Sequence, residues 1–400
     1  MNKRHRKTLM AIALVLAVSA ASLLAACGGE ETTSDDGAEV FKIGYSADLT
    51  GGFASYDVPI RDGAQTAVDE INEAGGINGV KLEMIVKDNK NDKVLAVQTT
   101  QELIDEGIQY LVGTTSDHVV ACNRLAQESE ISSSTGDGTA PNLVGDIGEY
   151  AFQYIMSDNI QGAALAEYSY NEMGYRNAFL LRCADIPYTA NLPVYFQDAF
   201  EKLGGKAVGL AEYKYEAGDF AAQVTKIQNA NPAPDVIFTP MFLPDTPVFL
   251  KQLRAAGVTI PVVSTDGNDT PDILSAGAKA LNGLKFTTFA YPSEGTSLAS
   301  FYDTYKAKYG KAPDTVIYAN GYDDIYILKA ALEKSGGKGG SALRDALANL
   351  SGLDLATTND YSMDPVTRRA KRSVALIEMK GDTFSFVEDL PYPTFVPDPL

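Results

Sequence analysis

Cysteine and histidine are scarce in this chain of 400 residues, which contains 3 cysteines and 2 histidines. A disulfide framework is therefore not what stabilises it, because exported proteins that depend on disulfides are rich in cysteine. Beyond Cys27, only Cys122 and Cys183 remain, and these two thiols either pair in an oxidising compartment or stay reduced. A metal cluster or a relay of two histidines is excluded, because His118 is the one histidine after the N-terminal segment.

Motifs for nucleotide binding and catalysis are also missing. The glycine-rich segment 335–341 lacks the order G-x-x-x-x-G-K-[ST], and no G-x-G-x-x-G follows a predicted strand. His118 has no serine in a G-x-S-x-G turn to activate. Asp323 and Asp324 are adjacent on a predicted helix, so we expect them to cap the helix or face solvent rather than to act as an acid/base pair. We predict a protein that is not an enzyme, with no catalytic residues, no cofactor and no metal.

The chain has fewer basic residues than acidic residues. The chain has 33 Lys and Arg against 52 Asp and Glu, a formal charge of −19. Four of the basic residues lie before residue 8, so the remainder has 29 basic and 52 acidic residues, a formal charge of −23. Such a surface repels nucleic acid and anionic lipid headgroups, and we expect no nucleic-acid partner.

The N-terminal segment has the pattern of an export signal. Basic residues precede an apolar run over 9–18, which is too short to span a membrane. An uncleaved membrane anchor is the alternative. The sequence Leu-Ala-Ala-Cys at 24–27 resembles the bacterial lipobox, in which the cysteine, here Cys27, is lipidated and becomes the new N-terminus. We therefore expect a lipoprotein signal peptide over 1–27, a flexible acidic tether over 28–39, and an extracytoplasmic protein anchored by lipid to the bacterial cell membrane.

The rest of the chain has the composition of a globular protein with more than one core, because 45% of its residues are hydrophobic and 21% are charged. From Val40 onward, short β-branched or aromatic runs alternate with segments of helical period, as in α/β proteins with mostly parallel sheets. A helix is predicted over 60–74, ending at Gly75-Gly76. Strands are predicted over 41–47, 81–87, 108–113, 178–183, 208–213, 236–239, 262–264 and 284–289.

Short motifs in a fixed order carry a resemblance to a known family. They are KIG at 42–44, LTGGFASY at 49–56, GA at 63–64, INEAGGING at 71–79, TAPN at 139–142, RAAG at 254–257 and GYD at 321–323. With this order, the chain resembles the leucine/isoleucine/valine-binding family of periplasmic-type solute-binding proteins. The resemblance spans almost all of the chain after the signal. It implies the type I fold of that class, an α/β fold of two Rossmann-like lobes joined by a three-strand hinge.

The resemblance implies a division into lobes and a set of partners. Lobe 1 would comprise 40–156 plus 287–362, and lobe 2 would comprise 157–286 plus 363–400. The lobes would close over a small amino-acid-like ligand, a branched-chain amino acid in the family, and deliver it to the membrane subunits of an ABC-type permease. We expect a monomer. Cys122 and Cys183 would then lie on different lobes, where a disulfide would oppose opening.

The resemblance also implies a binding site in loops that follow the strands, where ligands of open parallel sheets bind. Thr139 would contribute a hydroxyl to the ligand carboxylate, the backbone carbonyl of Asp117 would meet the ligand ammonium, and Asp266 would pair with that ammonium. Asp266 in Thr-Asp-Gly-Asn also fits a simple Asx turn. The aromatic positions of the site would be Tyr56, Tyr188, Phe242 and Tyr318.

One residue departs from the family pattern. Asp137, between two glycines, stands where the family usually has a small residue, and a carboxylate there would repel a ligand carboxylate. Asp137 either points to water or faces the ligand, and in the second case the ligand is cationic or hydroxylated. Two alternatives therefore stay open: the same fold with a cationic or aromatic ligand that is not an amino acid, and a membrane-tethered sensor. We favour delivery, because no output domain precedes Leu400.

Overall fold

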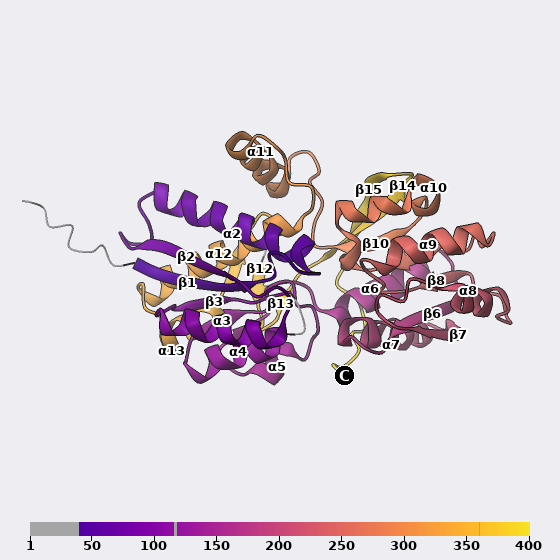
Figure 1. Cartoon of the computed structure of the whole chain (residues 1–400), viewed down its shortest axis with the longest axis horizontal. Helices are drawn as coiled ribbons and strands as arrows, with labels where there is room; N and C mark the ends of the chain where they lie inside the picture. The colour runs from indigo at the N-terminus through magenta and orange to yellow at the C-terminus, as the bar shows by residue number, and fades with distance from the viewer. Residues whose placement is uncertain (1–39, 116–117, 360) are drawn as a thin grey trace, which may run out of the picture. The chain divides into compact units, whose positions relative to one another are not determined.

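The computed structural model describes residues 40–115, 118–359 and 361–400 (Figure 1). The predicted signal peptide, with Cys27, and the predicted tether lie outside the described residues, as does Asp117. None of the helices in these ranges combines the length and the apolar character that a membrane crossing requires.

The first sheet, here named the β1 sheet, has five strands in the order β2-β1-β3-β4-β5. β1 pairs in parallel with β3, β3 with β4, and β4 with β5. Because these strands are parallel, their carboxyl ends share one edge of the sheet. The strands are β1 (Val40–Ala47), β2 (Lys81–Asp88), β3 (Tyr110–Val112), β4 (Ser132–Ser134) and β5 (Ala151–Phe152).

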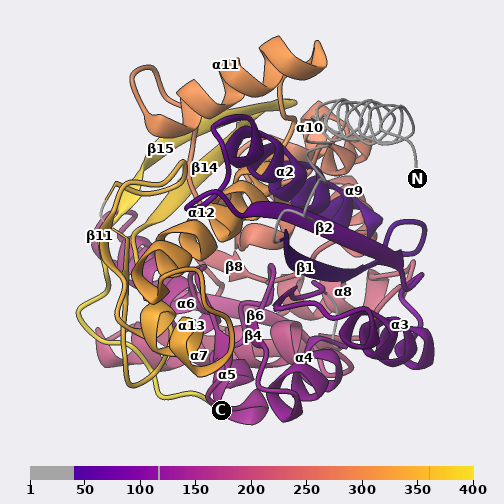
Figure 2. The ribbon, with the colours of Figure 1, turned by 90° about the vertical axis from the view of Figure 1, so that its left-hand side faces the viewer.

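Helices cover both faces of the β1 sheet. Figures 1 and 2 show α2 on one side of β1 and β2, and α3 and α4 on the other. Ile43 of β1 belongs to the same buried cluster as Ile60 of α2, whereas Leu111 of β3 packs with Leu103 of α3. The helices of this part of the chain are α2 (Ala54–Glu73), α3 (Lys93–Asp105), α4 (Val119–Glu128), α5 (Leu143–Ile147), α11 (Ser297–Tyr309), α12 (Ile317–Ser335) and α13 (Gly340–Ala348).

The second sheet, here named the β6 sheet, has seven strands in the order β15-β14-β10-β9-β8-β6-β7. Its pairs from β7 to β10 are parallel, and β14 and β15 extend it by antiparallel pairing. The strands are β6 (Asn177–Cys183), β7 (Lys206–Tyr213), β8 (Val236–Phe238), β9 (Val262–Ser264), β10 (Lys285–Thr288), β14 (Val374–Lys380) and β15 (Thr383–Leu390). The helices are α6 (Asp158–Asn171), α7 (Pro187–Lys202), α8 (Ala221–Gln228), α9 (Asp245–Ala255) and α10 (Ala278–Leu281), with short 3-10 helices η1 (Asp266–Asn268) and η2 (Pro271–Ala276).

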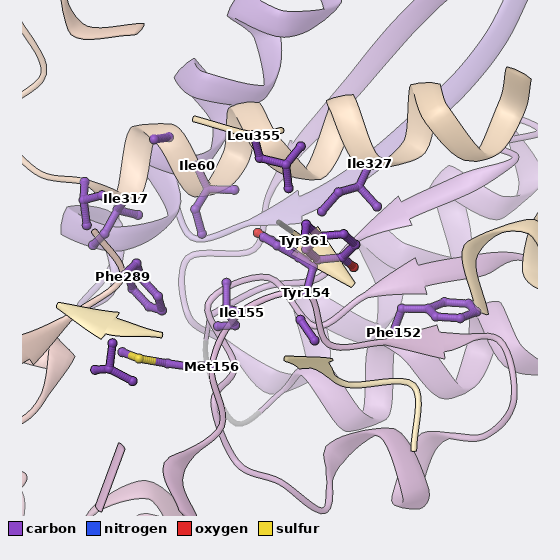
Figure 3. Packing of buried hydrophobic residues seen from close by; sticks show 14 of the residues in the cluster. Ile60, Phe152, Tyr154, Ile155, Met156, Phe289, Ile317, Ile327, Leu355 and Tyr361 are labelled. Carbon is purple, nitrogen blue, oxygen red and sulfur yellow. The ribbon is translucent and has the colours of Figure 1, made fainter. Parts of the chain in front are cut away.

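A buried apolar cluster joins three segments that are far apart in the sequence. Figure 3 shows Met156, Phe289 and Tyr361 packed together with residues of α2 and α12. Tyr361 belongs to a small antiparallel sheet of β11 (Ser351–Leu353), β12 (Tyr361–Met363) and β13 (Ala370–Lys371). The sequence places the chain crossings between lobes in these same three regions. The lobe boundaries themselves stay a prediction.

Each of the eight predicted strands is present, with ends that differ by no more than two residues from the prediction. β4, β5 and β11 to β15 were not predicted. β4 consists of three serines, which carry no hydrophobic pattern and are ordered by pairing with β3 and β5.

The predicted helix over 60–74 begins earlier, at Ala54, although Pro59 lies inside it. Proline removes one intrahelical hydrogen bond, so sequence reasoning places a helix start near it. Here the additional turn is held by tertiary contacts instead, because Tyr56 and Asp57 are buried within it. This turn carries an aromatic residue to the predicted site.

The expectation for Asp323 and Asp324 is wrong, since both side chains are buried. Asp323 accepts hydrogen bonds from the backbone N–H groups of Ala356 and Thr357, at 2.7 and 2.9 Å. Asp324 accepts hydrogen bonds from the hydroxyls of Tyr110 and Ser134, at 2.6 and 2.7 Å. Both are structural groups that connect α12 to neighbouring segments.

We predict that Gly63→Ala destabilises the protein, because α2 and α12 approach each other most closely at this glycine. A Cβ at Gly63 would lie 1.7 Å from the backbone oxygen of Tyr318, so the helices would have to separate. Overpacking of this kind costs about 1–3 kcal/mol in the free energy of unfolding, as urea denaturation would measure. Gly145→Ala is the matched control, since its Cβ meets nothing within 4 Å. Equal stability of the two variants would contradict the prediction.

Candidate ligand-binding site

A cavity of about 230 Å³ lies between loops of the β1 sheet and loops of the β6 sheet. Drug-sized ligands occupy roughly 300–1,000 Å³, so this volume suits a smaller organic solute. The β1 sheet and its helices contribute Phe53, Tyr56, Thr115, Val119, Val120, Asp137, Gly138, Thr139, Ala140, Asn142, Leu143, Asp146 and Ile317. The β6 sheet contributes Ile186, Pro187, Tyr188, Phe242, Asp266, Gly267 and Phe289.

The loops at the carboxyl ends of parallel strands provide most of this lining. Asp137 and Thr139 follow β4, Tyr188 follows β6, Phe242 follows β8, and Asp266 follows β9. The resemblance implied a site in the loops that follow the strands, and loops of this kind line the cavity.

Asp57, in the first turn of α2, holds two of the loops in place. Its carboxylate accepts hydrogen bonds from the backbone N–H of Asp48 at 2.7 Å, the hydroxyl of Thr114 at 2.9 Å and the backbone N–H of Thr115 at 3.0 Å. The residue is fully buried. Sequence reasoning missed Asp57, and its only signal was an acidic residue in the first turn of a helix, which is common for electrostatic reasons.

Four aromatic rings form a continuous wall of the cavity. Phe53 lies 5.9 Å from Tyr56 and 6.0 Å from Phe242, measured between ring centroids, and Tyr188 meets Phe242 edge-on at 5.9 Å. Gly267 lets this wall close, because a Cβ there would lie 2.8 Å from the Cβ of Phe242. The rings come from both sheets, so the wall is complete only when the two sets of loops are close together.

Asp266 presents a carboxylate to the cavity from the β6 sheet. Its Oδ1 accepts hydrogen bonds from the amide of Gln161 at 2.7 Å and from the hydroxyl of Tyr188 at 2.9 Å. Gln161 is held in turn by the hydroxyl of Thr287, which donates to its Oε1 at 2.8 Å. Burial raises the pKa of Asp266 to about 6, although the two donors oppose the shift.

Asp137 faces the cavity from the β1 sheet, which answers the question that the sequence left open. The turn that carries it is closed by a hydrogen bond from the N–H of Gly138 to the carbonyl of Thr135, at 2.8 Å. Its Oδ1 accepts a hydrogen bond from the amide of Asn320, at 2.8 Å. Burial raises the pKa of Asp137 well above its usual range, and the negative charge of Asp266 raises it further.

Direct hydrogen bonds join α2 to the loops of the β6 sheet, one across the cavity and one beside it. The hydroxyl of Tyr56 donates to the carbonyl of Gly267 at 3.0 Å, and the hydroxyl of Ser55 donates to Asp272 at 2.7 Å. Both donors belong to α2 and both acceptors to η1 or η2. The structure therefore has the loops of the two sheets in a closed arrangement.

The cavity brings together most of the residues that the resemblance implied, namely Tyr56, Asp137, Thr139, Tyr188, Phe242 and Asp266. Tyr318 does not line it. The ring of Tyr318 packs edge-on against Tyr305 at 5.1 Å, and the preceding residue, Ile317, reaches the cavity instead. Helical geometry explains the difference, because adjacent residues of a helix point about 100° apart.

The two cysteines are free and buried in this structure. Cys122 lies in α4, beside the β1 sheet, and Cys183 ends β6. Among the described residues, no group of His, Cys, Asp and Glu side chains has the arrangement that a metal ion needs.

We predict that the ligand-free protein loses stability as pH rises from about 4 to about 8. Burial raises the pKa of Asp158 to about 8, of Asp324 to about 7 and of Asp266 to about 6, so the folded state keeps protons that the unfolded chain releases near pH 4. Between its pKa in the unfolded chain and its pKa in the folded protein, each such group lowers the free energy of unfolding by at most about 1.4 kcal/mol per pH unit.

Urea denaturation at pH 5 and pH 8 would test this prediction. Asp158→Asn should flatten the dependence above pH 6, since it removes a group whose pKa burial raises to about 8. General repulsion between surface charges would leave the slope of this variant unchanged, and that result would contradict the assignment to buried carboxylates.

Comparisons with known proteins give consistent results. A family model described as periplasmic binding protein matches residues 40–383. The Leu/Ile/Val-binding protein homolog 3 of Brucella melitensis is 26% identical over 306 residues, which cover 75% of this chain and 80% of that protein.

Solved structures share the fold. The leucine-binding protein LivK of Thermotoga maritima superposes with a TM-score of 0.78 at 25% identity, covering 88% of this chain and 98% of that one. The branched-chain amino acid transporter substrate-binding protein LivJ of Streptococcus pneumoniae, solved with isoleucine, superposes with a TM-score of 0.80 at 24% identity, covering 88% and 99%. With its α/β fold of mostly parallel sheets and a matching segment that spans most of its length, the chain belongs to the periplasmic binding protein family.

Proposed function

We propose that this protein is an extracytoplasmic solute-binding lipoprotein that captures a small amine-bearing solute and delivers it to an ABC-type permease. One observation carries the proposal: the cavity between the two sheets is lined by aromatic rings from both sides and contains the carboxylate of Asp266. A carboxylate in a closed, dry site pairs strongly with an ammonium group. The names of the relatives, which bind leucine, isoleucine or valine, support a solute of amino-acid size.

Capture would work by closure. Ligand contacts with Asp266 on one side and with Tyr56 on the other are possible together only when the loops of both sheets meet, so a bound solute favours the closed state. The hydrogen bonds that Ser55 and Tyr56 of α2 donate to η2 and η1 would add to the contacts that hold the closed state. The closed surface would then be the form that the permease recognises.

The lipid anchor belongs to the same proposal. The lipobox at 24–27 and the acidic tether over 28–39 would hold the protein at the outer surface of the cytoplasmic membrane, within reach of a permease. The formal charge of −23 after the signal would keep the protein itself away from anionic headgroups.

A thermal-shift screen of the mature protein would test the proposal. The compounds are amino acids, simple amines, aromatic acids and sugars. We expect amine-bearing compounds to stabilise the fold, by about 2.7 kcal/mol at a hundredfold excess over the dissociation constant.

Asp266→Asn is the matched variant for this screen, because it keeps the shape of the side chain and removes its charge. We expect the stabilisation by amines to fall sharply in this variant. Stabilisation of the wild-type protein by sugars or aromatic acids alone would contradict the proposed solute class. An unchanged response of the variant would remove Asp266 from the site.

A further inference from the structure

Two carboxylates reach the cavity from opposite sheets. Asp137 lies in the turn after β4, and Asp266 begins η1 after β9. Each side chain is buried, with 8% of its residue's surface exposed. The side-chain donors that serve them, from Asn320 to Asp137 and from Gln161 and Tyr188 to Asp266, all use Oδ1. Oδ2 of each carboxylate has no side-chain donor among the described residues, and is therefore available to a ligand.

No side chain that lines the cavity carries a positive charge, in the part of the chain that the structure describes. Asp146 adds a third carboxylate to the lining. The guanidinium of Arg372 is buried nearby, but it donates to the carbonyl oxygens of Phe289 and Thr357 and does not line the cavity. The ionisable side chains that line the cavity are thus all acidic, so a cationic ligand would meet no like charge there.

The two tyrosine hydroxyls of the cavity wall are already engaged within the protein, whereas the hydroxyl of Thr115, which also lines the cavity, has no hydrogen-bond partner among the described residues. The hydroxyl of Tyr56 donates to Gly267, and that of Tyr188 bonds Asp266 and Thr265. The hydroxyls of Tyr56 and Tyr188 are therefore not free to bind a ligand carboxylate.

The aromatic wall independently favours a cationic ligand. The negative faces of Phe, Tyr and Trp rings attract organic cations, and recognition of alkylated ammonium groups uses rings of this kind together with carboxylates. Phe53, Tyr56, Tyr188 and Phe242 surround the cavity at centroid separations of about 6 Å.

We propose that the solute is an organic cation without a carboxylate, an amine or an alkylated ammonium compound, whose charged group lies between Asp137 and Asp266. This inference rests on the proposed function and narrows its solute class. The apolar part of the solute packs against the rings of Phe53 and Phe242. An α-amino acid fits less well, because its carboxylate would approach Asp137.

The competing arrangement is an amino acid whose carboxylate accepts a hydrogen bond from a protonated Asp137. It predicts the opposite order of affinities, so the two can be separated by pairs of amines in which one member carries a carboxylate and the other does not. Calorimetric titration of the mature protein at pH 7 would use 3-methylbutylamine against leucine, phenethylamine against phenylalanine, and choline against glycine betaine.

Within every pair that binds, we expect the member without the carboxylate to bind at least about tenfold more tightly. Equal or tighter binding of the carboxylate member would overturn the inference and leave the proposed function intact. If no member of any pair binds, the amine class is wrong and both proposals fail.

Asp137→Asn is the matched variant, because its side-chain oxygen still accepts the hydrogen bond from Asn320. We expect it to weaken binding of the amines and to reduce their advantage over the amino acids, while the circular dichroism spectrum stays that of the wild-type protein. Asp266→Asn should weaken both members of each pair. An unchanged preference in Asp137→Asn would show that Asp137 does not discriminate between them, which contradicts the inference.

Discussion

The site depends on two carboxylates that are held where water barely reaches. A carboxyl group in such a place either pairs with a positive charge or stays protonated and neutral, because burying an unpaired charge is costly. Gln161, Tyr188 and Asn320 hold the carboxylates of Asp266 and Asp137 in position, but they bring no charge. Burial raises the pKa of both groups, so the ligand-free protein keeps protons on them to a higher pH than ordinary carboxylates do. In our proposal, a cation would replace these protons.

The fold makes this arrangement possible by bringing carboxyl-end loops of two parallel sheets together. Neither sheet alone encloses the cavity, since the aromatic wall and the carboxylates are divided between them. Asp57 fixes the loops on one side through three hydrogen bonds, and Gly267 allows the wall to close on the other. In the proposed function, closure and ligand recognition would be one event, because the ligand would contact loops of both sheets.

The fold class and the position of the site could be predicted from sequence, because both depend on local pattern and on a rule about parallel sheets. Alternating apolar runs located the central strands, and the resemblance implied Asp266 and Tyr188, which both line the cavity. The partners of these residues could not be found in this way: Gln161 is 105 residues from Asp266, and Asn320 is 183 residues from Asp137. Tyr318 was misplaced by one position on a helix, which is enough to turn a side chain away from the cavity.

Proton release on binding tests the central claim most directly. Titration of the mature protein with 3-methylbutylamine or choline at pH 7, in buffers of different ionisation enthalpy, gives the number of protons lost per bound ligand. The account predicts net release, because a cation favours the ionised form of carboxylates whose pKa burial has raised. Net uptake, or no exchange at any pH between about 5 and about 8, would contradict it, since the carboxylates would then not be what holds the ligand.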